Sequence, residues 1–170
     1  MKIWLIILLF LGIHSASFGQ YKESEVREMA TNSSEGEILM HASTLTSEGF
    51  LYFAEILADK LLVLNNESSN YHYRKGFLML EIRKDYEGAI PHFQKAILEI
   101  NNRFDMFSTK ESGAPTDAIF YLATCYHLNE DIDKAIETYN LFKLNSNKNS
   151  ELLEVADLRL KQCELAKINM

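Results

Sequence analysis

Proline, glycine and cysteine are scarce in this sequence of 170 residues, which contains two prolines, seven glycines and two cysteines. Because proline and glycine interrupt regular structure, their scarcity beside abundant Leu, Ile, Ala, Glu and Lys favours helices over a sheet of short strands. The two cysteines, Cys125 and Cys163, are too far apart for a Cys-x-x-Cys metal or redox motif. We therefore expect one all-α domain, for which an apolar fraction of 47% supplies a sufficient core.

Positive charge is also in short supply, with 17 Lys and Arg against 24 Asp and Glu and a net charge of −7. No run of basic residues interrupts this balance, so a phosphate-rich partner would be repelled rather than attracted. We therefore expect no binding of nucleic acid.

The motifs that carry catalysis or bind cofactors are absent from the sequence. It has no His-Glu-x-x-His, no Gly-x-Ser-x-Gly and no glycine-rich phosphate loop. The acidic stretch 129–133 lacks the glycine and the terminal glutamate of a calcium loop and is better interpreted as a turn between helices. The sequence therefore predicts no catalytic residue, no metal ion and no cofactor, and we do not expect an enzyme.

The N-terminus has the pattern of an export signal. Lys2 supplies the positive charge, residues 3–13 are an uninterrupted run of eleven apolar or glycine residues, and Ser17 and Gly19 are the small residues of a cleavage site. A membrane anchor is the alternative, but eleven helical residues at about 1.5 Å each are far shorter than the roughly 30 Å hydrocarbon core. We expect a signal peptide over residues 1–19 and no membrane span after its cleavage. A polar segment, residues 20–34, follows.

Two stretches, residues 76–96 and 122–142, share the pattern of a helix, a short polar turn and a second helix. On each second helix an alanine, Ala89 or Ala135, is followed four residues later by an aromatic residue. This spacing places both side chains on one helical face. Small residues at such positions allow two helices to pack closely, while the aromatic residues fill the space between hairpins.

The pattern resembles the tetratricopeptide repeat family. The matching residues are Ala42 and Ala54 in a first repeat, Gly76, Ala89, Phe93 and Ala96 in a second, and Ile119, Leu122, Ala123, Tyr126, Ala135 and Tyr139 in a third. The resemblance implies a right-handed solenoid of antiparallel helix pairs over residues 35–170, with repeats at about 35–67, 69–103 and 116–149. Apolar residues at intervals of three and four then predict a capping helix over 151–167.

Both cysteines fall within these helical patterns, where a cysteine commonly serves as a small buried apolar residue. Export would nevertheless permit a disulfide between Cys125 and Cys163. We favour buried thiols, because the geometric window of a disulfide is narrow.

A twelve-residue insertion separates the second and third repeats, since Ala89 and Ala135 are 46 residues apart whereas Ala54 and Ala89 are 35 apart. It is best placed at 104–115, which ends in residues of loop composition. Three of its residues are too apolar for a solvated loop: Phe104, Met106 and Phe107. Either they pack back on the solenoid by extending the preceding helix, which we favour, or they are presented to a partner.

The first helices of the repeats would line a concave face, which is the candidate surface for a protein or peptide partner. Its positions are Leu39, Ser43, Tyr73, Phe77, Phe120, Thr124 and His127. Three of them are aromatic, and aromatic residues are enriched where proteins meet other proteins. For each residue the alternative is packing against the neighbouring repeat or the capping helix.

A further resemblance concerns location. The stretches 114–129, 133–136 and 158–164 look like the N-terminal repeat region of Gram-negative envelope proteins, in which β-propeller repeats and a peptidoglycan-binding domain of the outer-membrane-protein-A type follow. It implies an exported scaffold, periplasmic or outer-membrane associated, that binds another envelope protein in envelope organisation or secretion. The alternatives are a structural or oligomerisation module, or a truncated N-terminal part of a larger peptidoglycan-anchored protein.

Overall fold

The structure is a computed structural model, and it describes residues 21–146 and 151–168. These residues form eight helices, which confirms the all-α prediction. The helices are α2 (Glu23–Asn32), α3 (Glu35–Ser47), α4 (Leu51–Leu64), α5 (Ser69–Arg83), α6 (Tyr86–Ala96), α7 (Asp117–Leu128), α8 (Ile132–Asn145) and α9 (Leu152–Ile168). The expected signal peptide, and residues 147–150 at the end of the expected third repeat, lie outside the described residues.

Polar side chains fix where several helices begin. The Ser34 side chain accepts a hydrogen bond from the Glu37 amide, and the Glu37 carboxylate accepts one from the Ser34 amide at 2.8 Å, which is a capping box at the start of α3. Ser68 and Asp85 cap α5 and α6 in the simpler way, by accepting from one amide each. Helix α2 lies within the segment 20–34. Although this segment is polar on average, the helix buries two of its apolar residues, Val26 and Ala30.

Three hairpins, α3–α4, α5–α6 and α7–α8, each turn through a residue in the left-handed conformation. At each turn one residue has a positive φ: Gly49 (82°), Lys84 (53°) and Glu130 (62°). This left-handed conformation ends a helix within one residue, because it directs the chain away from the helical path. The α3–α4 and α7–α8 turns share one geometry, with the Phe50 amide donating to the Leu45 carbonyl and the Asp131 amide to the Tyr126 carbonyl, whereas the α5–α6 turn is one residue shorter.

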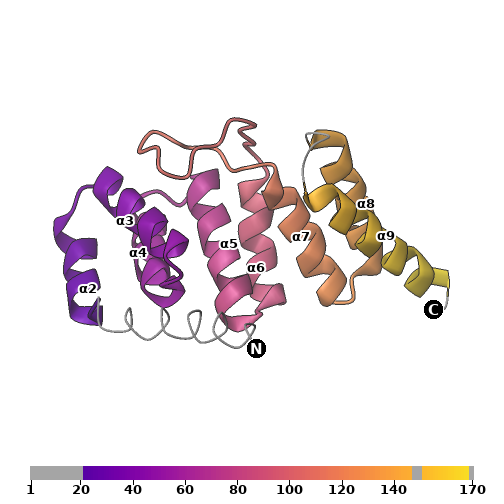
Figure 1. Ribbon diagram of the computed structural model, residues 1–170, viewed down its shortest axis with the longest axis horizontal. Coiled ribbons are helices and arrows are strands. Elements are labelled where there is room, and N and C mark those ends of the chain that lie inside the picture. The colour runs from indigo at the N-terminus through magenta and orange to yellow at the C-terminus, as the bar shows by residue number, and fades with distance from the viewer. Residues whose placement is uncertain (1–20, 147–150, 169–170) are drawn as a thin grey trace, which may run out of the picture.

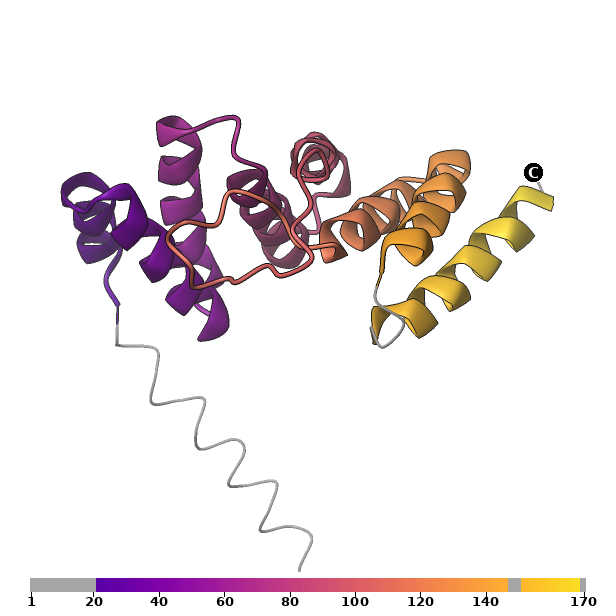
Figure 2. The ribbon, with the colours of Figure 1, turned by 90° about the horizontal axis from the view of Figure 1, so that it is seen from above.

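The helices stand in a single row from α2 to α9, as Figures 1 and 2 show. From α3 onward each helix packs against the next one along the chain, and α2 packs against α4. Ala54, Ala89 and Ala135 are completely buried at these contacts. Gly76 of α5 has the same role, since a Cβ atom built on it would lie 3.1 Å from the Phe93 ring of α6.

Two apolar cores occupy the row. One lies among α2, α3, α4 and α5, and the other extends from α5 to α9. Helix α5 contributes to both, with Leu78 in the first core and Leu80 in the second, while Phe77 packs against both. Cys125 and Cys163 are buried free thiols in the second core, so the favoured interpretation of the cysteines is confirmed.

The connection between α6 and α7, residues 97–116, is not helical and is called the strap below. Helix α6 ends at Ala96, so the expectation that the insertion extends it is wrong. Phe104 and Met106 are half-buried and do pack back on the helices, whereas Phe107 is 52% exposed. Figures 1 and 2 show the strap extending from α6 back toward α3 before it returns to α7. No helix in the described residues has both the length and the apolar character to cross a membrane.

Candidate functional site on the first helices

The seven predicted surface residues lie on α3, α5 and α7, the first helices of the three hairpins. Four of them are buried in this structure: Leu39, Ser43, Phe120 and Thr124. The other three, Tyr73, Phe77 and His127, are half-buried.

The reasons for burial differ among the four. Leu39 belongs to the first core. Phe120 packs between Phe142, at 5.4 Å between ring centroids, and the Arg159 guanidinium, at 5.8 Å. The Thr124 hydroxyl lies 3.2 Å from the hydroxyl of Tyr139, a residue of the second core. Ser43 lies beneath the strap and donates to its Met106 carbonyl.

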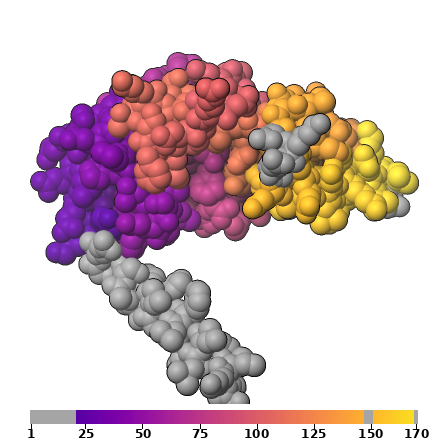
Figure 3. All heavy atoms as spheres, turned by 45° about the horizontal axis from the view of Figure 1, so that its top comes forward, coloured from indigo at the N-terminus to yellow at the C-terminus, as the bar shows by residue number. Residues whose placement is uncertain are grey.

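The strap is held on the first helices mainly through its main-chain carbonyl groups. The Met106 carbonyl oxygen accepts from the Ser43 hydroxyl at 2.6 Å and from Nη2 of Arg74 at 2.7 Å. The Asn70 side-chain amide donates to the Glu111 carbonyl, and the Asn70 main-chain amide donates to the Ser112 carbonyl, both at 2.9 Å. Figure 3 shows the strap atoms spread over the boundary between the N-terminal and central helices.

Asn70 and Arg74 are functional candidates that the sequence analysis missed. They share one stripe of α5 with Tyr73 and Phe77, at intervals of three, one and three residues. The two polar residues also bind each other, since Nε of Arg74 donates to the Asn70 side-chain oxygen at 2.9 Å. The same stripe spacing that selected the aromatic residues would have found them.

Arg74 is a buried cation with neutral partners. Burial lowers the pKa of its guanidinium to about 10, so it stays charged at neutral pH. Its hydrogen bonds go to a side-chain amide and to a main-chain carbonyl rather than to a carboxylate. A buried charge without an ion pair is costly, and a hydrogen bond to a charged donor is stronger than one to a neutral donor. Arg74 therefore binds the strap backbone strongly.

A small cavity of about 100 Å³ remains between the strap and the first helices. It is lined by Thr46, Tyr73, Arg74, Phe77, Leu78, Phe104 and Met106. Phe104 meets Tyr73 edge to face, with the ring centroids 5.8 Å apart. The strap thus places an aromatic and an aliphatic side chain over an apolar hollow in the helices.

The strap has a narrow neck where it leaves and rejoins the helices. The Asn101 amide donates to the Ala114 carbonyl and the Ala114 amide donates to the Glu99 carbonyl, both at 2.8 Å. Gly113 allows this approach, because a Cβ atom there would lie 3.1 Å from the Glu99 carbonyl oxygen. The two ends of the strap are therefore held together independently of its contacts with α3 and α5.

The Glu111 carboxylate organises the interior of the strap. It accepts from the Asn101 side-chain amide at 2.8 Å, from the Gly113 amide at 3.1 Å and from the Asp105 amide at 3.3 Å. Three donors from separate parts of the strap thus converge on one side chain, which keeps the strap folded.

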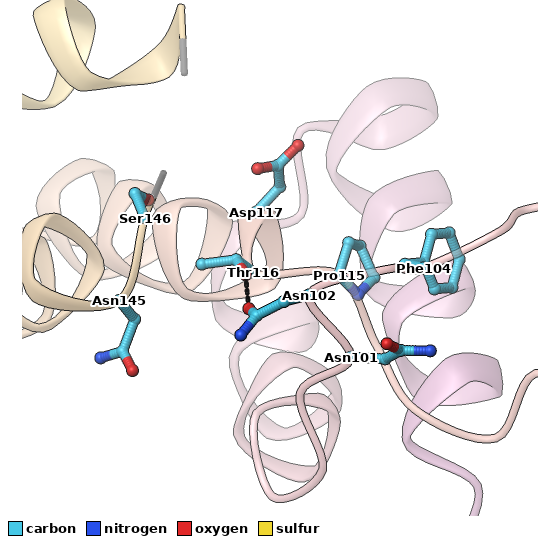
Figure 4. A pocket seen from close by; sticks show the side chains of 8 residues that line it. All are labelled: Asn101, Asn102, Phe104, Pro115, Thr116, Asp117, Asn145 and Ser146. Carbon is cyan, nitrogen blue, oxygen red and sulfur yellow. Dashed lines mark hydrogen bonds between the residues drawn. The ribbon is translucent and has the colours of Figure 1, made fainter. Parts of the chain in front are cut away.

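A polar hollow of about 550 Å³ lies on the other side of the strap, at the start of α7 (Figure 4). It is lined by Asn101, Asn102, Phe104, Pro115, Thr116, Asp117, Asn145 and Ser146. The Thr116 hydroxyl donates to the Asn102 side-chain oxygen at 2.8 Å, and burial raises the pKa of Asp117. The lining offers amides, hydroxyls and one carboxylate, which are hydrogen-bonding groups rather than a paired nucleophile and base.

Two histidine side chains lie close together on α5 and α6. Nδ1 of His72 and Nδ1 of His92 are 2.9 Å apart, and Nε2 of His72 lies 2.8 Å from the Asn66 carbonyl oxygen. Among the described residues no group of three His, Cys, Asp or Glu side chains is placed to hold a metal ion. The chain matches no protein-family model and no curated protein.

Proposed function

We propose that this protein is an exported, non-catalytic interaction module of the tetratricopeptide type, which holds a protein or peptide on the first helices α3, α5 and α7. The supporting features are the three hairpins, each with a positive-φ residue at its turn, and the small buried residues at the helix contacts. In a row of hairpins each unit contacts only its neighbours, and one extended face stays available for binding.

The observation that carries the proposal is how the first helices hold the strap. Ser43, Asn70 and Arg74 direct their donors at carbonyl groups of a non-helical backbone, beside an apolar hollow that Phe104 and Met106 of the strap also line. Main-chain hydrogen bonds combined with side-chain pockets are the means by which proteins bind extended peptides. The same face is therefore suited to a polypeptide partner.

The proposed setting is the cell envelope, where the protein would take part in envelope organisation or secretion. The N-terminal export pattern and the resemblance of residues 114–164 to envelope repeat proteins support this setting. No catalysis, metal or cofactor is part of the proposal, because the sequence carries none of the motifs that such chemistry requires.

The test is a cross-linked pull-down from an envelope fraction with the mature protein as bait. Tyr73→Ala should remove the captured partner while the helical circular-dichroism signal is kept. Tyr52→Ala is the matched control, because Tyr52 is a half-exposed tyrosine on α4. Equal capture by both variants would mean that the first helices do not form the binding face.

A second candidate function is self-association through α9. Val155, Leu158 and Ile168 of this helix are exposed at 39%, 60% and 79%. Exposed apolar side chains on one helix often mark a protein contact. Light scattering on the mature protein decides between the two: a stable oligomer that Leu158→Glu converts into monomers would favour this candidate.

A further inference from the structure

The strap contacts the first helices as a bound peptide would. Its three bonded carbonyl groups belong to Met106, Glu111 and Ser112, and none of these bonds depends on the identity of the strap side chain. Any backbone that follows the same course can accept the same donors. The polar part of the interaction is therefore not specific to the strap sequence.

The side-chain part of the interaction has a simple pattern. Phe104 and Met106 are two residues apart, and both line the hollow formed by Tyr73, Phe77 and Leu78. The strap turns on either side of these residues: the Phe104 amide donates to the Asn101 carbonyl and the Ser108 amide donates to the Asp105 carbonyl, both at 3.1 Å. These turns place an aromatic and an aliphatic side chain beside the hollow, separated by one residue, Asp105, which is exposed.

The neck allows the strap to leave this position. The hydrogen bonds between Asn101 and Ala114 and between Ala114 and Glu99 close the ends of the strap without using α3 or α5. Phe107, Thr109 and Lys110 are exposed, so a large part of the strap has little apolar contact to lose. Helices α6 and α7 need not move when the strap is displaced.

We propose that the strap is a built-in occupant of the peptide site, and that a partner displaces it with a segment of the pattern aromatic–x–aliphatic that turns as the strap does. The segment's carbonyl groups would accept from Ser43, Asn70 and Arg74, and its two apolar side chains would replace Phe104 and Met106. This inference rests on the proposed function, and it adds the chemistry of the partner and an autoinhibited resting state.

The first experiment removes the occupant. Residues 102–112 are replaced by a short glycine linker between Asn101 and Gly113, which the neck already holds close together. The probe is the excised segment itself, a fluorescent peptide of residues 102–112 with an amidated C-terminus, followed by anisotropy. When the strap occupies the site, an added peptide can bind only to the fraction of molecules whose site is free. The apparent affinity is therefore the intrinsic affinity multiplied by that fraction. We expect binding at least about tenfold tighter to the excised protein than to the intact one.

Two controls identify the site. A peptide with Phe104→Ala and Met106→Ala should bind the excised protein no better than a scrambled peptide. Arg74→Met in the excised protein removes a donor to the peptide backbone at similar side-chain volume and should weaken binding. A folded excised protein that does not distinguish the strap peptide from the scrambled one would overturn the inference.

The second experiment locks the strap closed. A Cβ atom at Gly36 would lie 3.3 Å from Cβ of Thr109, close to the spacing of about 3.5–4.5 Å in a disulfide. In Gly36→Cys with Thr109→Cys, the oxidised protein should bind no strap peptide and the reduced protein should bind it. Cys125 and Cys163 are buried and do not compete for the new thiols.

This pair of redox states decides the question even if the excised protein does not fold. Peptide binding that is equal in the oxidised and reduced proteins, or absent from both, overturns the inference. Capture of an envelope partner in the earlier pull-down would then still support the proposed function, so the two failures are distinguishable.

Discussion

At the scale of single residues, the contact between Gly76 and Phe93 sets how closely α5 approaches α6. Phe93 is completely buried and stacks on Tyr121, with the ring centroids 5.8 Å apart, so it has little room to move. An added methyl group at Gly76 would meet its ring at 3.1 Å. Protein interiors are close-packed, and even one methyl group in excess is felt.

We predict that Gly76→Ala destabilises the protein by about 1–2 kcal/mol, because overpacking outweighs the roughly 1 kcal/mol that alanine gains over glycine in a helix. Urea unfolding followed by circular dichroism measures the change. In a Phe93→Leu background the same substitution should be neutral or stabilising. A stabilised single variant would show that the ring can move aside.

The His72–His92 pair gives the protein a pH dependence. Burial, together with the neighbouring His72 ring, lowers the pKa of His92 from 6.5 to about 4. Burial also lowers the pKa of His72. A neutral His72 that donates from Nε2 to the Asn66 carbonyl can accept at Nδ1 from Nδ1 of His92. If both rings were positively charged, both Nδ1 atoms would be donors and this hydrogen bond would be lost.

We therefore predict that the free energy of unfolding falls as the pH is lowered from 6.5 to 4. In this range His92 takes up a proton in the unfolded chain but resists it in the folded chain. Above pH 6.5 both states are neutral at this position and the effect vanishes. Denaturant midpoints at pH 7 and pH 5 measure it, and His92→Gln should show a smaller drop than the unsubstituted protein. An equal drop in both would assign the pH dependence to other groups.

At the scale of the elements, α4 and α5 are joined by a buried carboxylate. Glu55 is 3% exposed and accepts from Nζ of Lys75 at 2.9 Å and from Nη2 of Arg83 at 2.6 Å. Burial alone would raise the pKa of Glu55, but the hydrogen bonds from Arg83 and Lys75 outweigh it and lower the pKa. Lys75 also lies 2.5 Å from Asp59, so it keeps a partner without Glu55.

We predict that Glu55→Gln lowers the free energy of unfolding by about 1.5–3 kcal/mol at pH 7, the usual range for hydrogen bonds to charged groups. Because the folded pKa lies below the unfolded value, this contribution is complete above the unfolded pKa and is lost as the pH falls through the folded one. The difference between the two proteins should therefore shrink in acid. Glu87→Gln, on the exposed surface of α6, is the control.

The strap depends on the Glu111 side chain to keep its folded shape. Glu111→Ala removes the acceptor for the Asn101, Asp105 and Gly113 donors. We predict faster tryptic cleavage at the exposed strap residues Arg103 and Lys110, with the helical signal unchanged. Glu87→Ala should leave the cleavage rate as it is. Unchanged cleavage in Glu111→Ala would show that the contacts with α3 and α5 suffice to hold the strap.

The helices could be predicted from the sequence, but the strap could not. Ala54, Ala89 and Ala135 recur with a helical pattern around them, and all three are buried. The strap instead depends on carbonyl groups, which every residue carries, and its helix partners Ser43 and Asn70 are far away in the sequence. No spacing rule connects such pairs. For the same reason the burial of Ser43 beneath the strap had no signal in its own neighbourhood.

At the scale of the whole molecule, stability is distributed along a row. Helices α5, α6 and α7 are covered on both sides by other helices, whereas α2 packs mainly against α4, and α9 against α8 and α7. In such an array, stability is approximately a sum of the units and the interfaces between neighbours. The ends of the row therefore have fewer interfaces to lose on opening.

We predict slowest amide hydrogen exchange in α5 to α7 and faster exchange in α2 and α9. Leu158→Pro, at an exposed position of α9, should accelerate exchange in α9 and α8 and leave α3 and α4 unaffected. Mass spectrometry of peptic fragments resolves the helices. Uniform exchange along the chain would mean that the row opens as one cooperative unit.

The neck at Asn101 and Ala114 also makes the protein suitable as a carrier for foreign loops. A segment whose ends are already paired can be exchanged for one of another length with little entropic cost, because closing the loop has been accomplished by the helices on either side. A library grafted between residues 101 and 113 would therefore display its members above a helical support of constant shape.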